Sequence, residues 1–550
     1  MQGITAGRDR APSHLAADPT EWLERVPADR LFMVLPDGRQ YTYGDLLDES
    51  GMIAAALQNL GTVPGDRIAV RVEKSAAAVV LYVACLRLGA AFVPINTAYS
   101  AAEVEYFLTD SKPRVAVVTP ADVVSLQPLE LAAHLLTLDA QGRGSLMDLA
   151  WRSDPDVTPG VRQFEPPSNL RADSLAAIVY TSGTTGRSKG AMLTRENLAS
   201  NARTLAKAWK FSSDDRLLHV LPLFHVHGLF AAINTVLASG SSMILLPSKF
   251  DAADAVRCLV EADVTVFMGV PTHYMRLLQE EGLNSESTAR MRLFVSGSAP
   301  LLAETHQEFF RRTGHHILER YGMTETLMNT SNPYEGARVP GSVGPPLPGV
   351  EVRVINPETG VVETAADTIG TLEIQGPNVF AGYWQAPEKT AGEFTADGWF
   401  KTGDLGKIDS NGYVHIVGRV KDLVISGGYN VYPKEVETEL DAIAGVVESA
   451  VFGVPHPDFG EGVTAAVVLQ PGAPLTEAGL LEAVRSRLAR YKLPKRILLM
   501  SELPRNAMGK VQKNVLRATN ESLYVAGSPR TATTRKSGAS KSPDSCVDGG

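Results

Sequence analysis

Short apolar runs alternate with longer amphipathic stretches along much of the chain. An apolar run at 68–72 is followed by an alanine-rich stretch that ends near Leu88, and then by a second apolar run at 91–95. Three further runs of this kind, each bounded by Gly, Pro or Ser, occupy residues 243–246, 264–268 and 293–295. Because parallel strands need long crossover connections, usually helices, this alternation predicts βαβ units and largely parallel sheets.

The pattern changes beyond residue 350. Short β-type runs separated by turns, at 352–355 and 370–375, predict a smaller β-rich subdomain. After Lys421, segments of mixed strand and helix character predict a separate α+β lobe: 433–440, 450–454, 464–469 and 479–488.

The expected fold is therefore α/β with two folded parts. A large N-terminal domain over residues 1–420 combines parallel-sheet α/β subdomains with the small β-rich subdomain, and a small α+β C-terminal domain covers residues 421–524. The final residues, 525–550, are rich in Ser, Thr, Gly and Pro and contain almost no large apolar side chains. Such a tail cannot offset the entropy lost on ordering, so it is predicted to be disordered.

Composition excludes several classes of protein. The formal net charge of -9 argues against a nucleic-acid partner, because binding a phosphate backbone requires a basic face. The three cysteines, Cys85, Cys258 and Cys546, are widely separated, which supports neither a disulfide framework nor a cysteine zinc site and fits a reducing, cytoplasmic setting. No apolar run reaches the roughly 18 to 20 residues of a membrane span, and no membrane partner is expected.

The segment 180–190, YTSGTTGRSKG, follows an apolar run at 175–179. Its glycines let the backbone approach a polyphosphate, its hydroxyls can donate hydrogen bonds, and Arg187 and Lys189 can offset negative charge. The spacing differs from the Walker A loop, because Ser188 stands where that loop requires glycine. The segment predicts a nucleotide-binding loop, and a flexible surface loop is the alternative.

Further motifs follow in the chain. Residues 321–326, YGMTET, place an aromatic ring, hydroxyls and one carboxylate within a single turn, and Glu325 beside a nucleotide could bind Mg²⁺. The carboxylate of Asp404, in the sequence Thr-Gly-Asp, could accept both hydroxyls of a ribose. Lys510 follows Gly509 in an exposed polar stretch near the end of the folded chain and is interpreted as a mobile cation.

These motifs, in this order, resemble those of the acyl-adenylate-forming superfamily of acyl-CoA synthetases, adenylation domains and luciferases, over nearly all of residues 31–524. The resemblance implies two half-reactions at one site. A carboxylate attacks the α-phosphate of MgATP to give an acyl-adenylate and pyrophosphate, and a thiol then displaces AMP.

The resemblance also implies a role for each motif. Tyr321 would stack on adenine, Asp404 and Arg419 would bind the ribose, and Thr324 would contact the α-phosphate. Mg²⁺ would be bound by Glu325 and Thr184. The β- and γ-phosphates of ATP would be held by the loop residues Thr181, Ser182, Gly183, Thr184, Thr185, Gly186 and Lys189.

The same resemblance implies that the C-terminal domain is mobile. Lys510 would neutralise the carboxylate and α-phosphate during adenylation. Lys421 stands at the hinge position of the superfamily. Rotation about it would withdraw Lys510 and bring Gly427 and Gly428 to a tunnel for the pantetheine arm of coenzyme A.

Within the superfamily the chain is most similar to the malonyl-CoA synthetases. The similarity lies in segments expected to form the acyl pocket: 221–230, 268–278, 294–302 and 319–334. It implies a small dicarboxylic acid, malonate or methylmalonate, that is converted to its CoA thioester with release of AMP and pyrophosphate. The second carboxylate would require a fixed cation, and Arg276 is the expected partner, with Ser296 and Ser298 assisting. An exposed charge on an amphipathic helix is the alternative for Arg276.

His225 is expected to line or gate the acyl pocket. A metal site shared with His227, on one face of a strand, is disfavoured because no Cys or acidic ligand lies within a few residues. Three other functions remain open. The chain could be a CoA ligase for another small carboxylic acid. An adenylation module could load a carrier protein in place of CoA, or the fold could serve a non-catalytic nucleotide-binding regulator.

Overall fold

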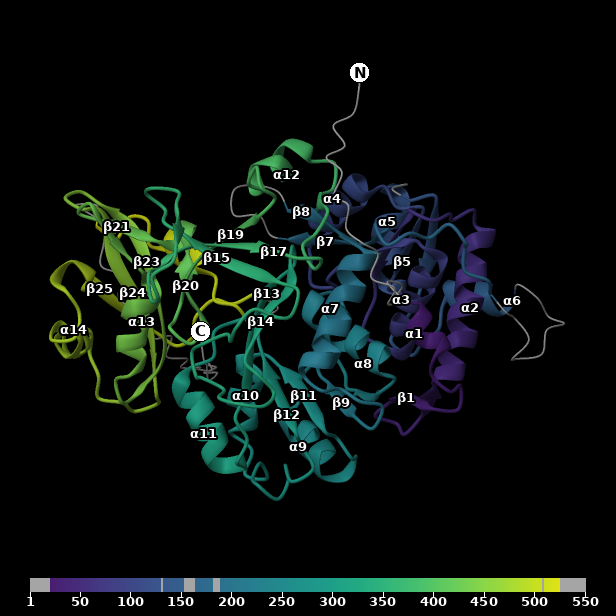
Figure 1. Ribbon diagram of the computed structural model, residues 1–550, viewed down its shortest axis with the longest axis horizontal. Helices are drawn as coiled ribbons and strands as arrows, with labels where there is room; N and C mark the ends of the chain where they lie inside the picture. The colour runs from purple at the N-terminus through teal and green to yellow at the C-terminus, as the bar shows by residue number, and fades with distance from the viewer. Residues whose placement is uncertain (1–19, 130–131, 153–163, 182–187, 507–508, 525–550) are drawn as a thin grey trace, which may run out of the picture. The chain divides into compact units, whose positions relative to one another are not determined.

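The computed structural model describes residues 20–129, 132–152, 164–181, 188–506 and 509–524 (Figure 1). The chain divides into two compact units. The first contains the chain up to Lys421 together with Arg505–Lys510, and the second contains Asp422–Pro504 together with the residues from Val511 onward.

An eight-stranded sheet forms one part of the first unit, in the order β14-β13-β12-β11-β9-β10-β1-β2. Its strands are β1 (Leu31–Val34), β2 (Gln40–Thr42), β9 (Arg216–His219), β10 (Ser242–Leu245), β11 (Val266–Gly269), β12 (Leu293–Ser296), β13 (Leu318–Met323) and β14 (Leu327–Ser331). The six inner strands, β13, β12, β11, β9, β10 and β1, pair in parallel. The edge strands β2 and β14 are antiparallel to their neighbours. The apolar runs at 243–246, 264–268 and 293–295 therefore belong to one sheet, with β9 between the first run and the other two.

A seven-stranded sheet forms a second part of this unit, in the order β18-β8-β7-β4-β3-β5-β6. Its strands are β3 (Arg67–Arg71), β4 (Ala91–Pro94), β5 (Val115–Val118), β6 (His134–Thr137), β7 (Leu175–Thr181), β8 (Lys189–Thr194) and β18 (Gly382–Tyr383). The strands β3 to β7 are parallel, and β8 returns antiparallel from β7 with Thr181 opposite Lys189. The predicted phosphate loop thus connects two paired strands.

Several helices begin at polar capping residues. Thr42 and Asp45 form a capping box for α2, and Ser75 caps α3, which ends at Gly89 in the left-handed conformation. The helices of this unit are α1 (Glu21–Glu24), α2 (Tyr43–Asn59), α3 (Ala76–Leu88), α4 (Ala101–Ser111), α5 (Val123–Leu126), α6 (Ser145–Arg152), α7 (Arg195–Ala208), α8 (Asn234–Ser239), α9 (Ala252–Glu261), α10 (Pro271–Leu277), α11 (Ala303–Thr313), α12 (Pro387–Glu393) and the π-helix η3 (His227–Ile233).

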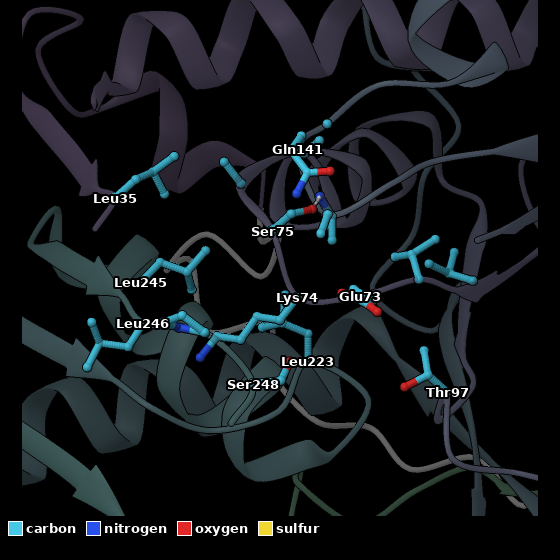
Figure 2. A pocket seen from close by; sticks show the side chains of 18 of the residues that line it. Leu35, Glu73, Lys74, Ser75, Thr97, Gln141, Leu223, Leu245, Leu246 and Ser248 are labelled. Atoms are coloured by element: carbon cyan, nitrogen blue, oxygen red, sulfur yellow. Dashed lines mark hydrogen bonds between the residues drawn. The ribbon is translucent and has the colours of Figure 1, made fainter. Parts of the chain in front are cut away.

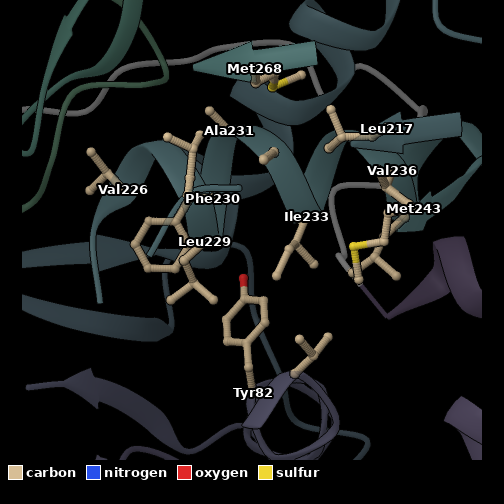
Figure 3. Close-up of a cluster of buried hydrophobic side chains, with 14 of the residues drawn as sticks. Tyr82, Leu217, Val226, Leu229, Phe230, Ala231, Ile233, Val236, Met243 and Met268 are labelled. Atoms are coloured by element: carbon tan, nitrogen blue, oxygen red, sulfur yellow. The ribbon is translucent and has the colours of Figure 1, made fainter. Parts of the chain in front are cut away.

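The two sheets share one hydrophobic core. Helix α7 packs against strands of both sheets, and α8 lies beside it (Figure 1). Figure 3 shows Tyr82 of α3 pointing toward Phe230 and Ile233 of η3. The Tyr82 and Phe230 ring centroids are 5.9 Å apart, and the Tyr82 hydroxyl donates a hydrogen bond of 2.9 Å to Asn234 Oδ1. This packing holds η3, whose first residue is His227, against the core.

The predicted β-rich subdomain is a five-stranded antiparallel sheet in the order β16-β15-β17-β19-β20. Its strands are β15 (Glu351–Ile355), β16 (Val362–Glu363), β17 (Gly370–Gln375), β19 (Phe400–Ile408) and β20 (Val414–Arg419). Asp404 of β19 lies opposite Arg419 of β20 in the register. Two predicted ribose-binding residues are therefore neighbours on adjacent strands.

The second unit is a small α+β structure with its own core. Its elements are β21 (Val424–Ser426), β22 (Tyr429–Val431), α13 (Pro433–Asp441), β23 (Val446–His456), β24 (Gly460–Leu469), α14 (Glu477–Arg485), β25 (Arg496–Met500) and α15 (Lys513–Thr519). The buried side chains of α13, α14 and the strands β23 to β25 form this core, with Val436, Leu440 and Leu480 fully buried. The predicted combination of parallel-sheet α/β subdomains, a β-rich subdomain and a small α+β domain is confirmed.

Two local predictions were wrong. Tyr321 and Met323 lie in β13 and not in a turn, because β13 continues as an antiparallel hairpin with β14; only Thr324–Thr326 form the turn. His225 and His227 do not lie on a strand, since His227 begins the π-helix η3. Among the described residues, no helix combines the length and apolar character needed to cross a bilayer.

Candidate active site

The base of the predicted phosphate loop is built by paired strand ends. Thr181 closes β7, and its hydroxyl donates to the Lys189 carbonyl at 3.4 Å and to Glu325 Oε1 at 3.5 Å. Lys189 opens β8, and its ammonium lies 3.3 Å from Glu393 Oε1 and 4.6 Å from the centroid of the Tyr383 ring. Five predicted residues of the loop, Ser182, Gly183, Thr184, Thr185 and Gly186, lie outside the described residues. The structure thus brings together the two ends of the loop and Glu325.

Glu325 is a buried carboxylate at the turn between β13 and β14. Its side chain accepts a hydrogen bond of 3.0 Å from the Tyr383 hydroxyl, and its carbonyl accepts one of 2.8 Å from the Phe380 amide. Burial raises the pKa of Glu325, and the Tyr383 hydrogen bond opposes that rise. A single carboxylate beside a phosphate loop is a donor set that suits Mg²⁺, which takes its remaining ligands from phosphate oxygens and water. Within the described residues, no cluster of three His, Cys, Asp or Glu side chains offers an alternative metal site.

A network of polar side chains joins the hairpin β13–β14 to the β-rich subdomain. The Tyr321 hydroxyl donates a hydrogen bond to Asp404 Oδ2, and Arg419 Nε lies 2.8 Å from Asp404 Oδ1. Asp404 is 2 % exposed, and its amide donates to Thr402 Oγ1 at 3.0 Å. Burial and the Asp404 charge raise the pKa of Tyr321 well above its usual value, which keeps the phenol neutral. Three residues predicted from separate motifs therefore form one network.

The predicted acyl-pocket residues gather at the end of β12. Ser296 closes that strand with a buried hydroxyl, and Ser298, two residues on, has φ 71° and hydrogen bonds to His227 Nδ1 at 3.2 Å. His225 accepts the His227 amide at 3.2 Å through Nδ1. Burial, helped by the nearby Arg320 charge, lowers the pKa of His225 to about 4, so its imidazole is neutral near pH 7. Both histidines are thereby suited to lining a pocket.

Arg320 is a buried cation that the sequence analysis did not single out. It is 4 % exposed, and burial lowers the pKa of its guanidinium. A β-carbon on Gly297 would lie 2.3 Å from Arg320 Cζ, so the guanidinium rests directly on the backbone between Ser296 and Ser298. In the described structure Arg320 Nε and Nη2, Ser296 Oγ and His227 Nε2 are buried without hydrogen-bond partners. Such unsatisfied donors beside one another are costly unless a ligand accepts from them.

Arg276, the predicted partner of the second carboxylate, is exposed on α10. Its neighbour Tyr274 is buried and donates to the Val295 carbonyl at 2.7 Å, which fixes the helix against β12. The role assigned to Arg276 stays a prediction. The two arginines differ in their exposure to water, because Arg320 is buried and Arg276 is exposed.

Residues 20–384 match the family model described as AMP-binding enzyme, and residues 435–510 match the model described as AMP-binding enzyme C-terminal domain. The chain belongs to the AMP-binding enzymes.

Three similar proteins illustrate the range of this family. A mitochondrial malonate–CoA ligase of Mus musculus is 37 % identical over 543 residues, covering 91 % of this chain and 89 % of that protein. A long-chain-fatty-acid–CoA ligase of Bacillus subtilis is 34 % identical over 519 residues, covering 89 % of this chain and 92 % of that protein. The crystal structure of ATP-bound MatB from Rhodopseudomonas palustris is 51 % identical, with a TM-score of 0.87, and covers 93 % of this chain and 100 % of that chain.

In the second unit of this AMP-binding enzyme, Gly427 and Gly428 form the two-residue turn of the β21–β22 hairpin. Their φ angles are 60° and 82°, which is the conformation that a tight hairpin turn requires and that glycine adopts at least cost. No atom lies within 4 Å of a β-carbon built on Gly428, so its backbone is open to a ligand. The hairpin turn explains why glycine occupies both positions. Both glycines are exposed, which is compatible with the predicted contact with the pantetheine arm.

The two predicted lysines lie in exposed segments. Lys421 belongs to the short 3-10 helix Val420–Asp422, where the chain passes between the two units. Lys510 is exposed, and its amide donates to Asn506 Oδ1 at 3.0 Å. Their roles as hinge and as catalytic cation stay predictions.

Three residues of the site were missed in the sequence analysis: Arg320, Tyr383 and Glu393. Arg320 precedes Tyr321 on a strand whose first three positions are buried, and a charged residue within a buried strand is itself a signal. Tyr383 and Glu393 lie close to Glu325 and Lys189 only because β18 pairs with β8. No spacing within the sequence indicates that pairing.

Proposed function

We propose that this chain is a malonate–CoA ligase that works through an acyl-adenylate. In the first half-reaction a carboxylate oxygen of malonate attacks the α-phosphorus of ATP, the bond to the bridging oxygen breaks, and pyrophosphate leaves. In the second, the thiolate of coenzyme A attacks the malonyl carbonyl and AMP leaves, giving malonyl-CoA.

One observation carries the choice of acid. Arg320 presents Nε and Nη2, the two nitrogens on one edge of the guanidinium, without partners in the buried surroundings of Ser296 and His227. That edge matches the two oxygens of a carboxylate, and the pairing would offset the cost of burying both charges. A monocarboxylic acid would leave Arg320 uncompensated. Sequence identity to these two relatives does not distinguish the acids, because the mouse malonate–CoA ligase and the Bacillus long-chain ligase are similarly identical to this chain, at 37 % and 34 %.

The remaining residues take roles that fit this reaction. Thr181, Lys189 and the loop between them would hold the β- and γ-phosphates, and Thr324 would contact the α-phosphate. Tyr321 would stack on adenine while its hydroxyl holds Asp404, and Asp404 and Arg419 would take the ribose hydroxyls. The hydrogen bond from Tyr321 to Asp404 supports this use of one network for base and sugar.

Mg²⁺, held by Glu325 and the phosphates, would supply positive charge that stabilises the departing pyrophosphate. Tyr383 assists by donating to Glu325, which favours the ionised carboxylate that a metal requires. Lys510 would neutralise charge at the α-phosphate during adenylation, and rotation at Lys421 would then exchange it for the Gly427–Gly428 turn and the pantetheine arm of CoA.

The test is AMP release with ATP and CoA across acetate, propionate, malonate, methylmalonate, succinate and octanoate. We expect the highest kcat/KM with malonate or methylmalonate, and a thioester product identified by mass spectrometry. Preference for a monocarboxylate would overturn the choice of acid and retain the adenylation chemistry. Acyl-adenylate formation that yields thioester only with a carrier protein would overturn CoA as the acceptor.

A further inference from the structure

The proposed site has an acyl end and a phosphate end. A cavity of about 740 Å³ beside the amino end of α3 belongs to the acyl end, because Leu223, Phe224 and Leu229 of the predicted acyl-pocket segment 221–230 line it. Figure 2 shows Leu223 among the residues of its wall. At the phosphate end, Lys189 is paired with Glu393, a carboxylate to which neither half-reaction assigns a role.

Lys189 is held between an aromatic ring and this carboxylate. Its ammonium lies 4.6 Å from the centroid of the Tyr383 ring and 3.3 Å from Glu393 Oε1. The Tyr383 hydroxyl donates to Glu325 at 3.0 Å, so one ring connects Lys189 with the predicted Mg²⁺ ligand. An ammonium over a ring face is attracted by the ring quadrupole, and this contact can keep Lys189 in place while its anionic partner changes.

Glu393 is fixed in position by the residues on both sides of it. It is the last residue of α12, and within that helix Thr390 Oγ1 accepts a hydrogen bond of 2.9 Å from the Tyr383 amide of β18. The next residue, Phe394, stacks on Phe380 with the ring centroids 5.9 Å apart. The ion pair is therefore built into the fold and does not depend on a chance contact between two long side chains.

The Lys189–Glu393 pair is partly buried. The exposed fraction of the side chain is 21 % for Lys189 and 34 % for Glu393. A fully buried ion pair would be costly to open, and a fully exposed one would contribute little. At this intermediate exposure a phosphate oxygen can reach Lys189 and replace the carboxylate oxygen.

The charge of Glu393 opposes a polyphosphate. Glu393 lies in the last turn of α12, which contains no basic residue, and the negative end of the helix dipole adds to the repulsion. Lys401 offsets part of this effect, since its ammonium donates to the Gly392 carbonyl at 3.4 Å. The charge also reaches Glu325, whose pKa is raised mainly by burial and in addition by Glu393. Glu393 should thus lower the affinity of the phosphate end for anions.

We propose that Glu393 is a resident counter-ion of Lys189, which it yields to the β- and γ-phosphates of ATP and pairs with again when pyrophosphate leaves. This role rests on the proposed function, because it takes Lys189 as a phosphate ligand. Glu393 acts through Lys189 and weakens the binding of ATP and of pyrophosphate alike. The weaker binding favours release of pyrophosphate before coenzyme A reacts.

Calorimetric titration of the full-length chain with Mg²⁺–ATP and with AMP, in the absence of any carboxylic acid, tests this role. Glu393→Gln keeps the shape of the side chain and removes its charge. ATP should bind at least about threefold more tightly to this variant, because no carboxylate competes for Lys189. AMP lacks the β- and γ-phosphates, so its affinity should stay within about 1.5-fold of wild type. A general loss of structure would instead weaken both ligands.

Glu388→Gln is the matched control, since it removes the same charge from the exposed first turn of α12. It should change neither ligand by more than about 1.5-fold. Lys189→Met should weaken ATP, and in that background Glu393→Gln should no longer tighten it, because the cation for which the two anions compete is absent. In malonate turnover, Glu393→Gln should lower the inhibition constant of pyrophosphate at least about threefold.

Unchanged ATP binding in Glu393→Gln would overturn the proposal, as would a tightening that persists in the Lys189→Met background. Weaker ATP binding with a higher requirement for Mg²⁺ would assign Glu393 to the metal and also overturn it. If the wild-type chain binds ATP and turns over no malonate, the proposed acid is refuted while the counter-ion role is retained. If it binds no ATP, both are refuted.

Discussion

Replacing Arg320 by Met tests the proposed recognition of malonate. The variant keeps an unbranched apolar stem and removes the two donors, Nε and Nη2, that lack partners in the described structure. If each donates one charge-assisted hydrogen bond to the second carboxylate, at about 1.5 to 3 kcal/mol per bond, the loss is about 3 to 6 kcal/mol. At about 1.4 kcal/mol per factor of ten, kcat/KM for malonate should fall by about 10² to 10⁴.

The assay is malonate-dependent AMP release, with propionate as a second substrate that lacks the distal carboxylate. Propionate activity should be retained or should rise in Arg320→Met, because the variant no longer leaves a buried cation unpaired. Arg276→Met is the matched control, since it removes an exposed arginine from α10, the helix that Tyr274 fixes against β12. If Arg320→Met keeps malonate kcat/KM within about threefold of wild type while Arg276→Met loses it, the assignment of the distal carboxylate to Arg320 is refuted.

Gly297→Ala should impair malonate turnover at least about tenfold, because a β-carbon there would lie 2.3 Å from Arg320 Cζ and must displace the guanidinium; wild-type kinetics in a folded variant would contradict the observed packing. Tyr383→Phe removes a hydrogen-bond donor that lowers the pKa of Glu325. The acidic limb of the pH–rate profile, measured at limiting Mg²⁺, should therefore move to higher pH. If the limb does not move, the ionisation of Glu325 does not control metal binding. Burial raises the pKa of Asp441 to about 6 from 3.8, so the folded state holds its proton more tightly and loses stability as pH rises from about 4 to 6. Asp441→Asn should therefore raise the free energy of unfolding by about 1 to 2 kcal/mol at pH 8 and by much less at pH 4, as measured by urea denaturation; equal effects at both pH values would refute this interpretation.

The sequence predicted the architecture well where burial determines the pattern. Parallel strands buried on both faces read as short apolar runs, and those at 264–268 and 293–295 became the adjacent strands β11 and β12. Tyr321, Asp404 and Arg419 were assigned through motif resemblance and meet in one hydrogen-bonded network. The sequence could not indicate that contact directly, since more than eighty residues separate the tyrosine from its partners.

The acyl pocket was harder to predict, because its polarity depends on which residues are desolvated. Arg276 follows Met275 and Arg320 follows Glu319, and only the three-dimensional packing buries Arg320 and exposes Arg276. Likewise, His227 alternates with His225 as residues of a strand do, yet it begins a π-helix whose apolar residues pack around Tyr82. Tertiary packing overrode local periodicity at both places.

The pairing of β18 with β8 has a consequence for biosynthesis. Until Gly382 and Tyr383 leave the ribosome, β8 is the terminal strand of the seven-stranded sheet and presents unpaired backbone groups. Nascent chains that stop short of residue 383 should therefore expose an aggregation-prone edge beside the phosphate loop, although all the parallel strands of that sheet have already been made.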